Sequence, residues 1–251
     1  MSKNYKEKIA EERIEKFKSS PTSVLGISFS ENTEQQRLLR LMQKPDLPYI
    51  FLLGDAGTGK TFATVAGALD LVLMQRKYKE IWYCRAAKEV ADGEGMGYLP
   101  GELDEKFALY CMPLVDNLNS IAKKCKSVNV DYIMKNTIQC VPPNYMRGRS
   151  FEDAIIIVDE AQNMTYDQIQ TLMTRISDTC KIVFMGSLNQ IDLKNKKVSE
   201  NGFKLVMDCC KQNGFEQEGL CGFVEFVQSM RSPFCVKVDK ALTLFKQERN
   251  H

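Results

Sequence analysis

The sequence predicts a single α/β domain in which a mostly parallel sheet is flanked by helices. Short apolar segments that suit buried strands alternate along the 251 residues with segments of helical periodicity. Residues 49–61 place a glycine-rich turn between such a strand and a helix. Residues 155–158 are four β-branched apolar residues in a row, which is typical of a strand buried on both faces of a parallel sheet.

Composition places the chain among ordinary globular proteins. Apolar residues make up 44% and charged residues 26%, and the net charge of +2 gives no general basic field for a nucleic acid. A nucleic-acid surface would therefore have to be a local patch. No apolar run approaches the ~18 residues of a membrane span, and the first residues lack the apolar core of an export signal. We expect a soluble cytoplasmic protein without a membrane partner, in the host cytoplasm if the chain is virus-encoded.

The nine cysteines do not form a metal-binding pattern. No two are spaced C-x-x-C, and the one histidine is the terminal His251, so the usual zinc ligands are missing. In a cytoplasmic chain these cysteines are expected to be reduced thiols.

The N-terminal part is expected to be helical. Residues 1–28 are interpreted as a helical arm ahead of a main domain over 29–251, because residues 4–19 alternate in charge and carry a modest apolar stripe. A second helix is predicted over 32–42, ending before Pro45. Its glutamines Gln35 and Gln36 lie just upstream of the glycine-rich turn. One of them could bring its amide to an adenine edge, although glutamine is also a common surface residue of helices.

The glycine-rich turn reads G-x-x-x-x-G-K-[ST], with Gly54, Gly59, Lys60 and Thr61 at the fixed positions. Its strand–loop–helix context is that of a phosphate-binding P-loop, whose backbone N–H groups point at phosphate oxygens at the positive end of a helix. Lys60 would reach the β- and γ-phosphates, and the Thr61 hydroxyl would bind Mg²⁺. The expected nucleotide contacts are Gly54, Asp55, Ala56, Gly57, Thr58, Gly59, Lys60, Thr61 and Phe62.

The middle of the chain predicts two more strands and a long helix. Strands are expected over 80–85 and 137–141, with a glycine-rich loop over 92–101 that is functional or mobile. Residues 102–126 show a helical apolar face in which Pro113 indicates a kink or a break between two helices. The pair Arg147 and Arg149, set across a glycine, is a basic surface turn or a functional pair, and spacing alone does not decide between them.

Two acids end the most apolar strand. Asp159 and Glu160 follow residues 155–158 directly, at the carboxyl end where open α/β sheets bind ligands. Asp159 would hold the Mg²⁺ shell through water, and Glu160 would align and deprotonate the attacking water.

The remaining segments complete the predicted sheet. A capping box at Thr165–Gln168 opens a helix, and a strand over 181–186 leads to Gln190, which could sense the γ-phosphate. A last strand over 222–227 is followed by Arg231 and a final helix through Leu244.

Six motifs together resemble the PhoH family of P-loop ATPases, which are related to the first RecA-like domain of superfamily 1 helicases. They are GDAGTGKT (54–61), GYLPGELDEK (97–106), YMRGRSF (145–151), IIIVDEAQN (155–163), GSLNQIDL (186–193) and MRSP (230–233). The resemblance covers about residues 30 to 245.

The resemblance implies a RecA-like core that hydrolyses ATP with Mg²⁺, with suspected RNA binding or remodelling and a link to phosphate starvation in bacterial members. By position, the ATPase roles fall to Lys60, Thr61, Asp159, Glu160, Gln190 and Arg231. Gln35 rather than Gln36 would read adenine. Arg147 and Arg149 become candidates for contacts with single-stranded RNA.

Two departures from the family pattern concern the site. Ser187 stands where the family usually has an aspartate after glycine, so a carboxylate near the γ-phosphate is missing. The segment from Arg85 to Gly93 is about two residues longer than the family pattern, which leaves the position of Glu89 open.

Two functions are therefore considered. The first is an ATPase motor or remodeller acting on RNA. Because the chain carries one P-loop and room for one RecA-like domain, such a motor would need a homo-oligomer, plausibly a hexamer, with Arg231 serving its own site or a neighbour's. The second is a nucleotide-dependent assembly switch without unwinding activity. A P-loop kinase is disfavoured because no arginine-rich lid segment is present.

Overall fold

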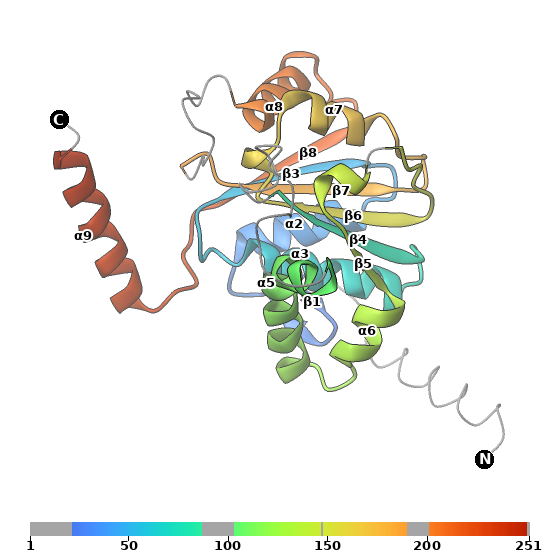
Figure 1. The fold of residues 1–251 in the computed structure, drawn as a ribbon, viewed down its shortest axis with the longest axis horizontal. Helices are drawn as coiled ribbons and strands as arrows, with labels where there is room; N and C mark the ends of the chain where they lie inside the picture. Colours follow the sequence, from blue (N-terminus) through green and yellow to red (C-terminus); the bar gives the residue numbers. More distant parts are fainter. Residues whose placement is uncertain (1–21, 87–102, 147, 190–200, 250–251) are drawn as a thin grey trace.

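The computed structural model describes residues 22–86, 103–146, 148–189 and 201–249. Its centre is a six-stranded sheet of order β5-β4-β6-β7-β3-β8 in which every neighbouring pair is parallel (Figure 1). The strands are β3 (Tyr49–Gly54), β4 (Glu80–Arg85), β5 (Ile138–Cys140), β6 (Ala154–Asp159), β7 (Lys181–Gly186) and β8 (Cys221–Phe226). Because all six run the same way, their carboxyl ends share one edge of the sheet.

The strand order sets the distance between the two strongest sequence motifs. β3 leads into the P-loop and β6 ends in Asp159, and β7 alone separates them. One strand between these two is the arrangement of RecA-like P-loop domains. The predicted fold class, a RecA-like domain with a mostly parallel sheet between helices, is confirmed.

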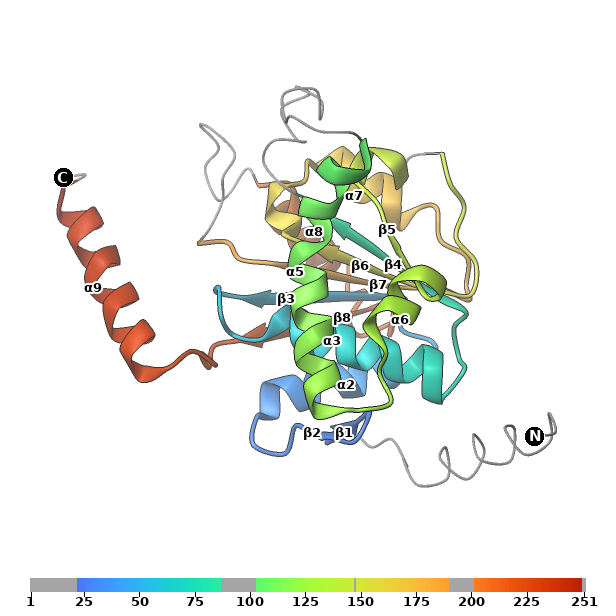
Figure 2. The same cartoon turned by 60° about the horizontal axis from the view of Figure 1, so that its bottom comes forward.

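Helices cover both faces of the sheet. The face that holds the P-loop helix carries α2 (Thr33–Gln43), α3 (Lys60–Leu69), α5 (Leu103–Lys124) and α6 (Val130–Asn136), and α5 lies against α3 (Figure 2). The other face carries α7 (Tyr166–Met173) and α8 (Gly202–Gln212). Short helical turns, η1 (Asp70–Met74), η3 (Pro143–Met146) and η4 (Ala161–Asn163), connect these elements.

The core explains why β6 is so apolar. Every residue of β6 is buried, and Ile155 and Ile157 face one helical layer while Ile156 and Val158 face the other. Each such side chain contributes about 1.5–3 kcal/mol by leaving water. A strand with helices on both faces therefore needs a continuous apolar run instead of an alternating one.

Before α2, the chain forms a short hairpin of β1 (Ser23–Val24) and β2 (Ile27–Ser28). Val24 and Leu25 are buried in the core of the domain, and the Leu25 N–H donates to the buried Asp70 carboxylate at 3.1 Å. Of the helical arm predicted over 1–28, only this hairpin lies within the described residues. The division of the chain at residue 28 stays a prediction.

The prediction for residues 102–126 needs a correction. The break considered at Pro113 is absent, because α5 continues through it as one helix of 22 residues. Proline removes one N–H from the helical pattern and its ring crowds the carbonyl four residues before, yet the helix accommodates Pro113 without ending. The Asn117 amide donates to the Pro113 carbonyl at 2.7 Å and adds a side-chain bond in the following turn.

A second correction concerns the cysteines. The structure joins Cys111 of α5 to Cys140 of β5 in a disulfide, whereas the sequence analysis expects reduced thiols. The seven other cysteines are free. The pair is 29 residues apart in sequence, and nothing in its spacing reveals that the fold brings the two sulfurs together.

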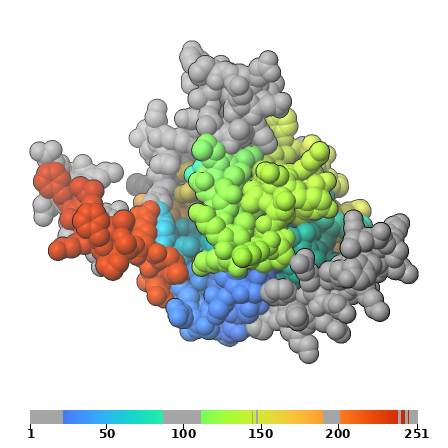
Figure 3. Space-filling view, turned by 90° about the horizontal axis from the view of Figure 1, so that it is seen from below, coloured from blue at the N-terminus to red at the C-terminus, as the bar shows by residue number. Residues whose placement is uncertain are grey.

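The last helix, α9 (Pro233–Arg249), stands apart from the layered body in both ribbon views (Figure 2). Seen from below, α9 projects in red beyond the face formed by α5 and α6 (Figure 3). Phe234 and Leu242 on α9 are 75% and 65% exposed. Among the helices that the structure describes, none is both long and apolar enough to cross a membrane.

Candidate nucleotide-binding site

The P-loop leaves β3 at Gly54 and enters α3 at Lys60. Gly57 and Gly59 have φ angles of 79° and 81°, in the left-handed region that glycine adopts without strain. The Thr58 hydroxyl donates to the Asp55 carbonyl at 2.8 Å and closes the turn. The loop therefore presents its backbone N–H groups at the N-terminus of α3, which is the geometry that binds phosphate.

Lys60 lies across this loop. Its ammonium group donates to the carbonyls of Gly54 at 2.6 Å and Asp55 at 3.0 Å. Burial lowers the pKa of Lys60, and the carboxylates of Asp159, Glu160 and Asp55 act in the opposite direction. The charged lysine thus sits among the three acids of the site without a strong ion pair to any of them.

Asp159 ends β6 on the same face as α3 and is 5% exposed. The buried Tyr83 hydroxyl donates to Asp159 Oδ2 at 2.7 Å, and the Glu160 N–H donates to Oδ1 at 3.1 Å. Burial raises the pKa of Asp159, while the Tyr83 hydrogen bond and the charges of Arg85 and Lys60 lower it. Oxygen ligands of this kind are the ones that Mg²⁺ prefers.

Glu160 follows in a constrained conformation. Its φ of 56° is in the left-handed region, which is costly for a residue other than glycine and which Leu25, Arg76 and Asp153 share outside the site. The Gln162 amide donates to Glu160 Oε2 at 2.7 Å. On the other side Arg85 Nη2 lies 3.8 Å from Glu160 Oε1.

Gln162 links Glu160 to the end of β7. Its Oε1 accepts the Ser187 N–H at 3.1 Å, and its side chain is 1% exposed. A Cβ on Gly186 would come within 2.8 Å of that oxygen, so the glycine makes room for the amide. This contact ties the strand that carries the acid pair to the strand beside the P-loop.

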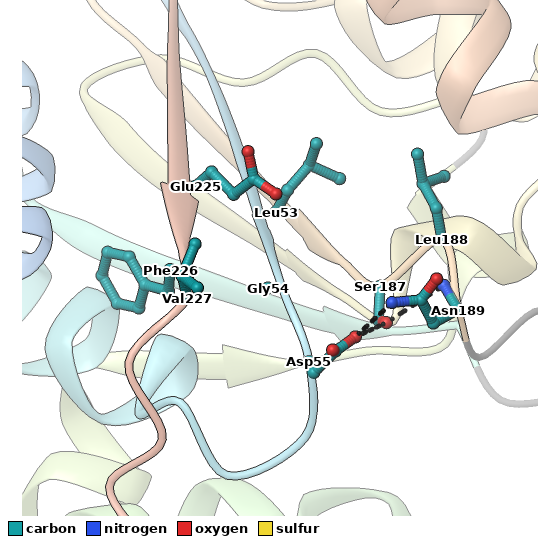
Figure 4. A pocket seen from close by; sticks show the side chains of 9 residues that line it. All are labelled: Leu53, Gly54, Asp55, Ser187, Leu188, Asn189, Glu225, Phe226 and Val227. Carbon is teal, nitrogen blue, oxygen red and sulfur yellow. Dashed lines mark hydrogen bonds between the residues drawn. The ribbon is translucent and has the colours of Figure 1, made fainter. Parts of the chain in front are cut away.

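Ser187 continues the same polar chain to the P-loop (Figure 4). Its hydroxyl donates to Asp55 Oδ1 at 2.9 Å, and the Asn189 amide donates to the same oxygen at 3.0 Å. Position 187 lacks the carboxylate that the family resemblance leads us to expect there. The structure brings the carboxylate of Asp55 within hydrogen-bonding distance of that serine.

A cavity of about 280 Å³ opens beside the P-loop, between the carboxyl ends of β3, β7 and β8. Asp55 and Ser187 line one side, and Glu225 enters from β8 (Figure 4). The remaining lining residues are Leu53, Gly54, Leu188, Asn189, Phe226 and Val227.

Arg231 lies on the P-loop of its own chain. A side chain on Gly57 would overlap the Arg231 side chain, and the Met230 N–H donates to the Gly57 carbonyl at 2.8 Å. From the sequence alone, Arg231 could serve its own site or a neighbour's. The structure brings it to its own.

Gln35 also reaches the P-loop. Its side-chain amide is buried and lies 2.9 Å from where a Cβ of Gly59 would be. Gln36 instead donates to the carbonyls of Phe29 and Ser30 and accepts from Arg40. Only the first of the two glutamines is therefore placed to meet a nucleotide.

Phe62 is turned away from the loop. Its ring lies 6.1 Å from that of Phe29 and under the Lys124 ammonium, at 5.1 Å. Only the backbone of this residue, and not its ring, is left to contact a phosphate.

The predicted RNA contacts lie elsewhere. Arg149 is exposed and its guanidinium lies 5.0 Å from the ring centre of Trp82, on the face of the sheet that α7 and α8 cover. Arg147 and Gln190, together with Glu89 and the glycine-rich loop 92–101, lie outside the described residues. The structure therefore brings Gln35, Lys60, Asp159, Glu160 and Arg231 to one edge and leaves Arg149 away from it.

Three residues of the site have no role among the sequence-based predictions. Arg85 ends its strand as Asp159 does, so the rule that selects the acid pair could have selected it. Gln162 stands two residues after Glu160, although its partner Ser187, just after β7, is 25 residues away. Tyr83 carries no signal, because a tyrosine in an apolar strand is indistinguishable from a core residue.

A family model described as PhoH-like protein matches residues 29–243. Protein PhoH2 of Bacillus subtilis (strain 168) is 35% identical over 204 residues, which are 80% of this chain and 45% of that protein. Protein PhoH of Escherichia coli (strain K12) is 31% identical over 211 residues, which are 82% of this chain and 55% of that protein. The chain thus spans about half the length of the curated relatives it matches.

Among solved structures, Bacteroides sp Pif1 in complex with ADP-AlF4 is similar at 17% identity and a TM-score of 0.37, over 80% of this chain and 43% of that one. A likeness of that size supports no conclusion about this chain.

Proposed function

The chain belongs to the PhoH family, and from that premise we propose that it hydrolyses ATP with Mg²⁺ and acts on single-stranded RNA as a homo-oligomer. One observation carries the proposal: the P-loop and the Asp159–Glu160 pair lie at the same edge of the sheet. A protein that only binds a nucleotide needs no acid placed to activate water.

The residues divide the work as follows. The N–H groups of 54–61 bind the phosphates, Lys60 turns from the loop carbonyls to the β- and γ-phosphates, and Gln35 reads adenine. Thr61 and Asp159 would hold Mg²⁺, which would neutralise charge on the phosphates. Glu160 takes a proton from the attacking water, and Arg231 stabilises the charge that develops on the phosphates. Gln190 and the pair Arg147 and Arg149 keep the roles that the resemblance implies, at the γ-phosphate and on RNA.

Glu160→Gln tests the hydrolytic role. The variant keeps the length and hydrogen bonds of the side chain but cannot accept the proton, so turnover should fall by about 10²–10⁴-fold while ATP affinity stays. Steady-state ATPase rates and nucleotide titration measure the two quantities. Wild-type turnover in this variant would remove Glu160 from the role of base.

RNA coupling is tested by the ATPase rate with and without single-stranded RNA across a salt series. A strand held through its phosphates should raise the rate at low salt, and the effect should fade as salt rises. A rate independent of RNA at every salt concentration would contradict this part of the proposal.

The exposed apolar side chains of α9 support a homo-oligomer. Phe234 and Leu242 are open to water in one copy, and a second copy would bury them. We expect a ring of six subunits whose specific ATPase activity rises with protein concentration. Phe234→Asp with Leu242→Asp should lower the mass in solution, whereas Tyr132→Asp, at a side chain 62% exposed on α6, should not. A monomeric mass for the wild type would contradict the oligomer.

A nucleotide-dependent assembly switch is the second candidate. What favours it is that Glu160 is already held by Gln162 and approached by Arg85, and that Ser187 replaces a family carboxylate. Slow hydrolysis unaffected by RNA, together with assembly that depends on ATP, would support the switch over the motor.

A further inference from the structure

Arg85 is a cation at the carboxyl edge of the sheet, beside the proposed site, and the six motifs do not include it. It ends β4, where it lies beside Asp159 in the register of the sheet. Because strand residues alternate between faces, Arg85 shares with Tyr83 the face that holds Asp159. The Ala86 N–H donates to the Asp159 carbonyl at 2.8 Å and fixes the arginine against the end of β6.

The contacts of its guanidinium are loose. Nη2 lies 3.8 Å from Glu160 Oε1, which is within range of a charge interaction but too long for a hydrogen bond. Nε is buried without a hydrogen-bond partner in the described part of the chain. An arginine that served only to hold the fold together would normally have its buried N–H groups paired.

Glu160 is consequently held between two strands. Gln162 bonds one carboxylate oxygen and connects it through Ser187 to the P-loop side, while Arg85 attracts the other oxygen toward β4. In the strand order β4 lies on the side of β6 away from the P-loop. The arginine therefore draws the proposed base away from the place where ATP would bind.

We propose that Arg85 is a positioning residue that restrains Glu160, and that a phosphodiester group of a bound single strand lifts the restraint by taking the guanidinium. The inference rests on the proposed ATPase function and names how that site is regulated. A guanidinium suits this exchange because it binds phosphate through two parallel hydrogen bonds, which are stronger than a 3.8 Å contact with a carboxylate.

The position of Arg85 favours the strand over ATP as the source of that phosphate. The phosphates of ATP belong at the P-loop after β3, and both β7 and β6 lie between β3 and β4. The side chain of Arg85 is 31% exposed, so an outside ligand can reach it.

Three variants test the restraint. Arg85→Gln removes the charge, and Arg85→Lys keeps it without the two-pronged geometry. Arg37→Gln is the matched control, because it breaks an ion pair of the same 3.8 Å length with Glu216, at the surface and away from the edge. Each is assayed for kcat and KM at saturating Mg²⁺, with and without poly(U), and for ADP affinity as a check on the fold.

Arg85→Gln should raise the RNA-free kcat by about threefold to fivefold, a modest gain because a partly exposed ion pair is weak. KM should not change, and poly(U) should no longer stimulate. Arg85→Lys should raise the RNA-free kcat less than Arg85→Gln does and should be stimulated more weakly than the wild type, and Arg37→Gln should behave as wild type.

Each of the following three outcomes would contradict one part of the proposal. If the wild type is active but Arg85→Gln has an unchanged or lower RNA-free rate, the restraint is wrong. If Arg85→Gln is faster but poly(U) never stimulates the wild type, RNA is wrong as the releasing ligand. A wild type without ATPase activity contradicts the proposed function itself, and with it any restraint on hydrolysis.

Discussion

Two lysines that donate to backbone carbonyls lie at opposite edges of the sheet, Lys181 fully buried and Lys60 half-buried. Lys60 at the carboxyl edge donates to the carbonyls of Gly54 and Asp55. Lys181, at the amino edge where β7 begins, is fully buried and donates to the carbonyls of Lys44 and Leu47. Burial lowers the pKa of both, that of Lys181 to about 8.

The difference lies in what else each ammonium group faces. Lys60 is near Asp159, Glu160 and Asp55 and is partly open to a ligand. Lys181 is fully buried, and among the described residues the charges that act on it are those of Lys77 and Asp46. Lys181 joins the end of α2 to the sheet. A shifted pKa therefore indicates a functional lysine only where acids and an accessible space accompany it.

The largest expected effect is a loss of ATPase activity on substitution of Lys60 but not of Lys181. Lys60→Ala should reduce ATPase kcat/KM by about 10²–10³-fold or more, because it removes the charge that meets the phosphates. Lys181→Met should leave the KM for ATP unchanged. Nucleotide titration and steady-state kinetics measure both, and a comparable loss of ATP binding in Lys181→Met would end the distinction.

The next largest effect is a change in the free energy of unfolding with pH. The folded-state pKa of Lys181 is about 8 and the unfolded value is 10.5, so between these values the unfolded chain binds more protons. The unfolding free energy contributed by Lys181 therefore rises with pH in that window. The free energy of unfolding of the wild type minus that of Lys181→Met should increase by about 2 kcal/mol from pH 7.5 to 9.5.

Denaturant unfolding at several pH values measures this difference, and the subtraction removes groups common to both proteins, such as Tyr78 with its pKa raised to about 12. Lys135→Met, at an exposed lysine of α6, is the control and should show no such rise. If the difference in unfolding free energy between the wild type and Lys181→Met did not change with pH, the buried lysine would not titrate in this range.

The smallest effect compares two tyrosine hydroxyls. Tyr83 donates to Asp159 and Tyr49 donates to the Met173 carbonyl, both at 2.7 Å. Tyr83→Phe should weaken Mg²⁺ affinity by about tenfold, because a carboxylate that holds a metal loses its orienting partner. Tyr49→Phe should leave it unchanged. Equal Mg²⁺ affinities in the two variants would assign Tyr83 to the core alone.

The parts that the sequence predicts well are those that local chemistry decides. The buried run before Asp159 and the capping box of α7, with Thr165 and Gln168 bonded to each other, follow from residues close in the chain. The P-loop geometry also depends on its own glycines. These features confirm the predicted fold and bring the acid pair to the P-loop edge.

What sequence reasoning misses depends on distant partners. The contact of Ser187 with Asp55 spans 132 residues, and the meeting of Cys111 with Cys140 depends on how α5 crosses the sheet. At Pro113 the local rule predicts a kink or a break, and the break is absent because the buried Leu114 and Leu118 keep both sides of Pro113 in one helix. Elements as short as β1 and β2 give too little periodicity to detect.

The hydrogen bond from Met230 to Gly57 has a mechanical consequence. Only Arg231 and Ser232 separate Met230 from Pro233, where α9 begins, and three residues of chain reach about 10 Å at most. The N-terminal end of the projecting helix α9 is thus tethered through this short segment to the phosphate-binding loop. Force applied to α9 from outside reaches the nucleotide site without passing through the sheet.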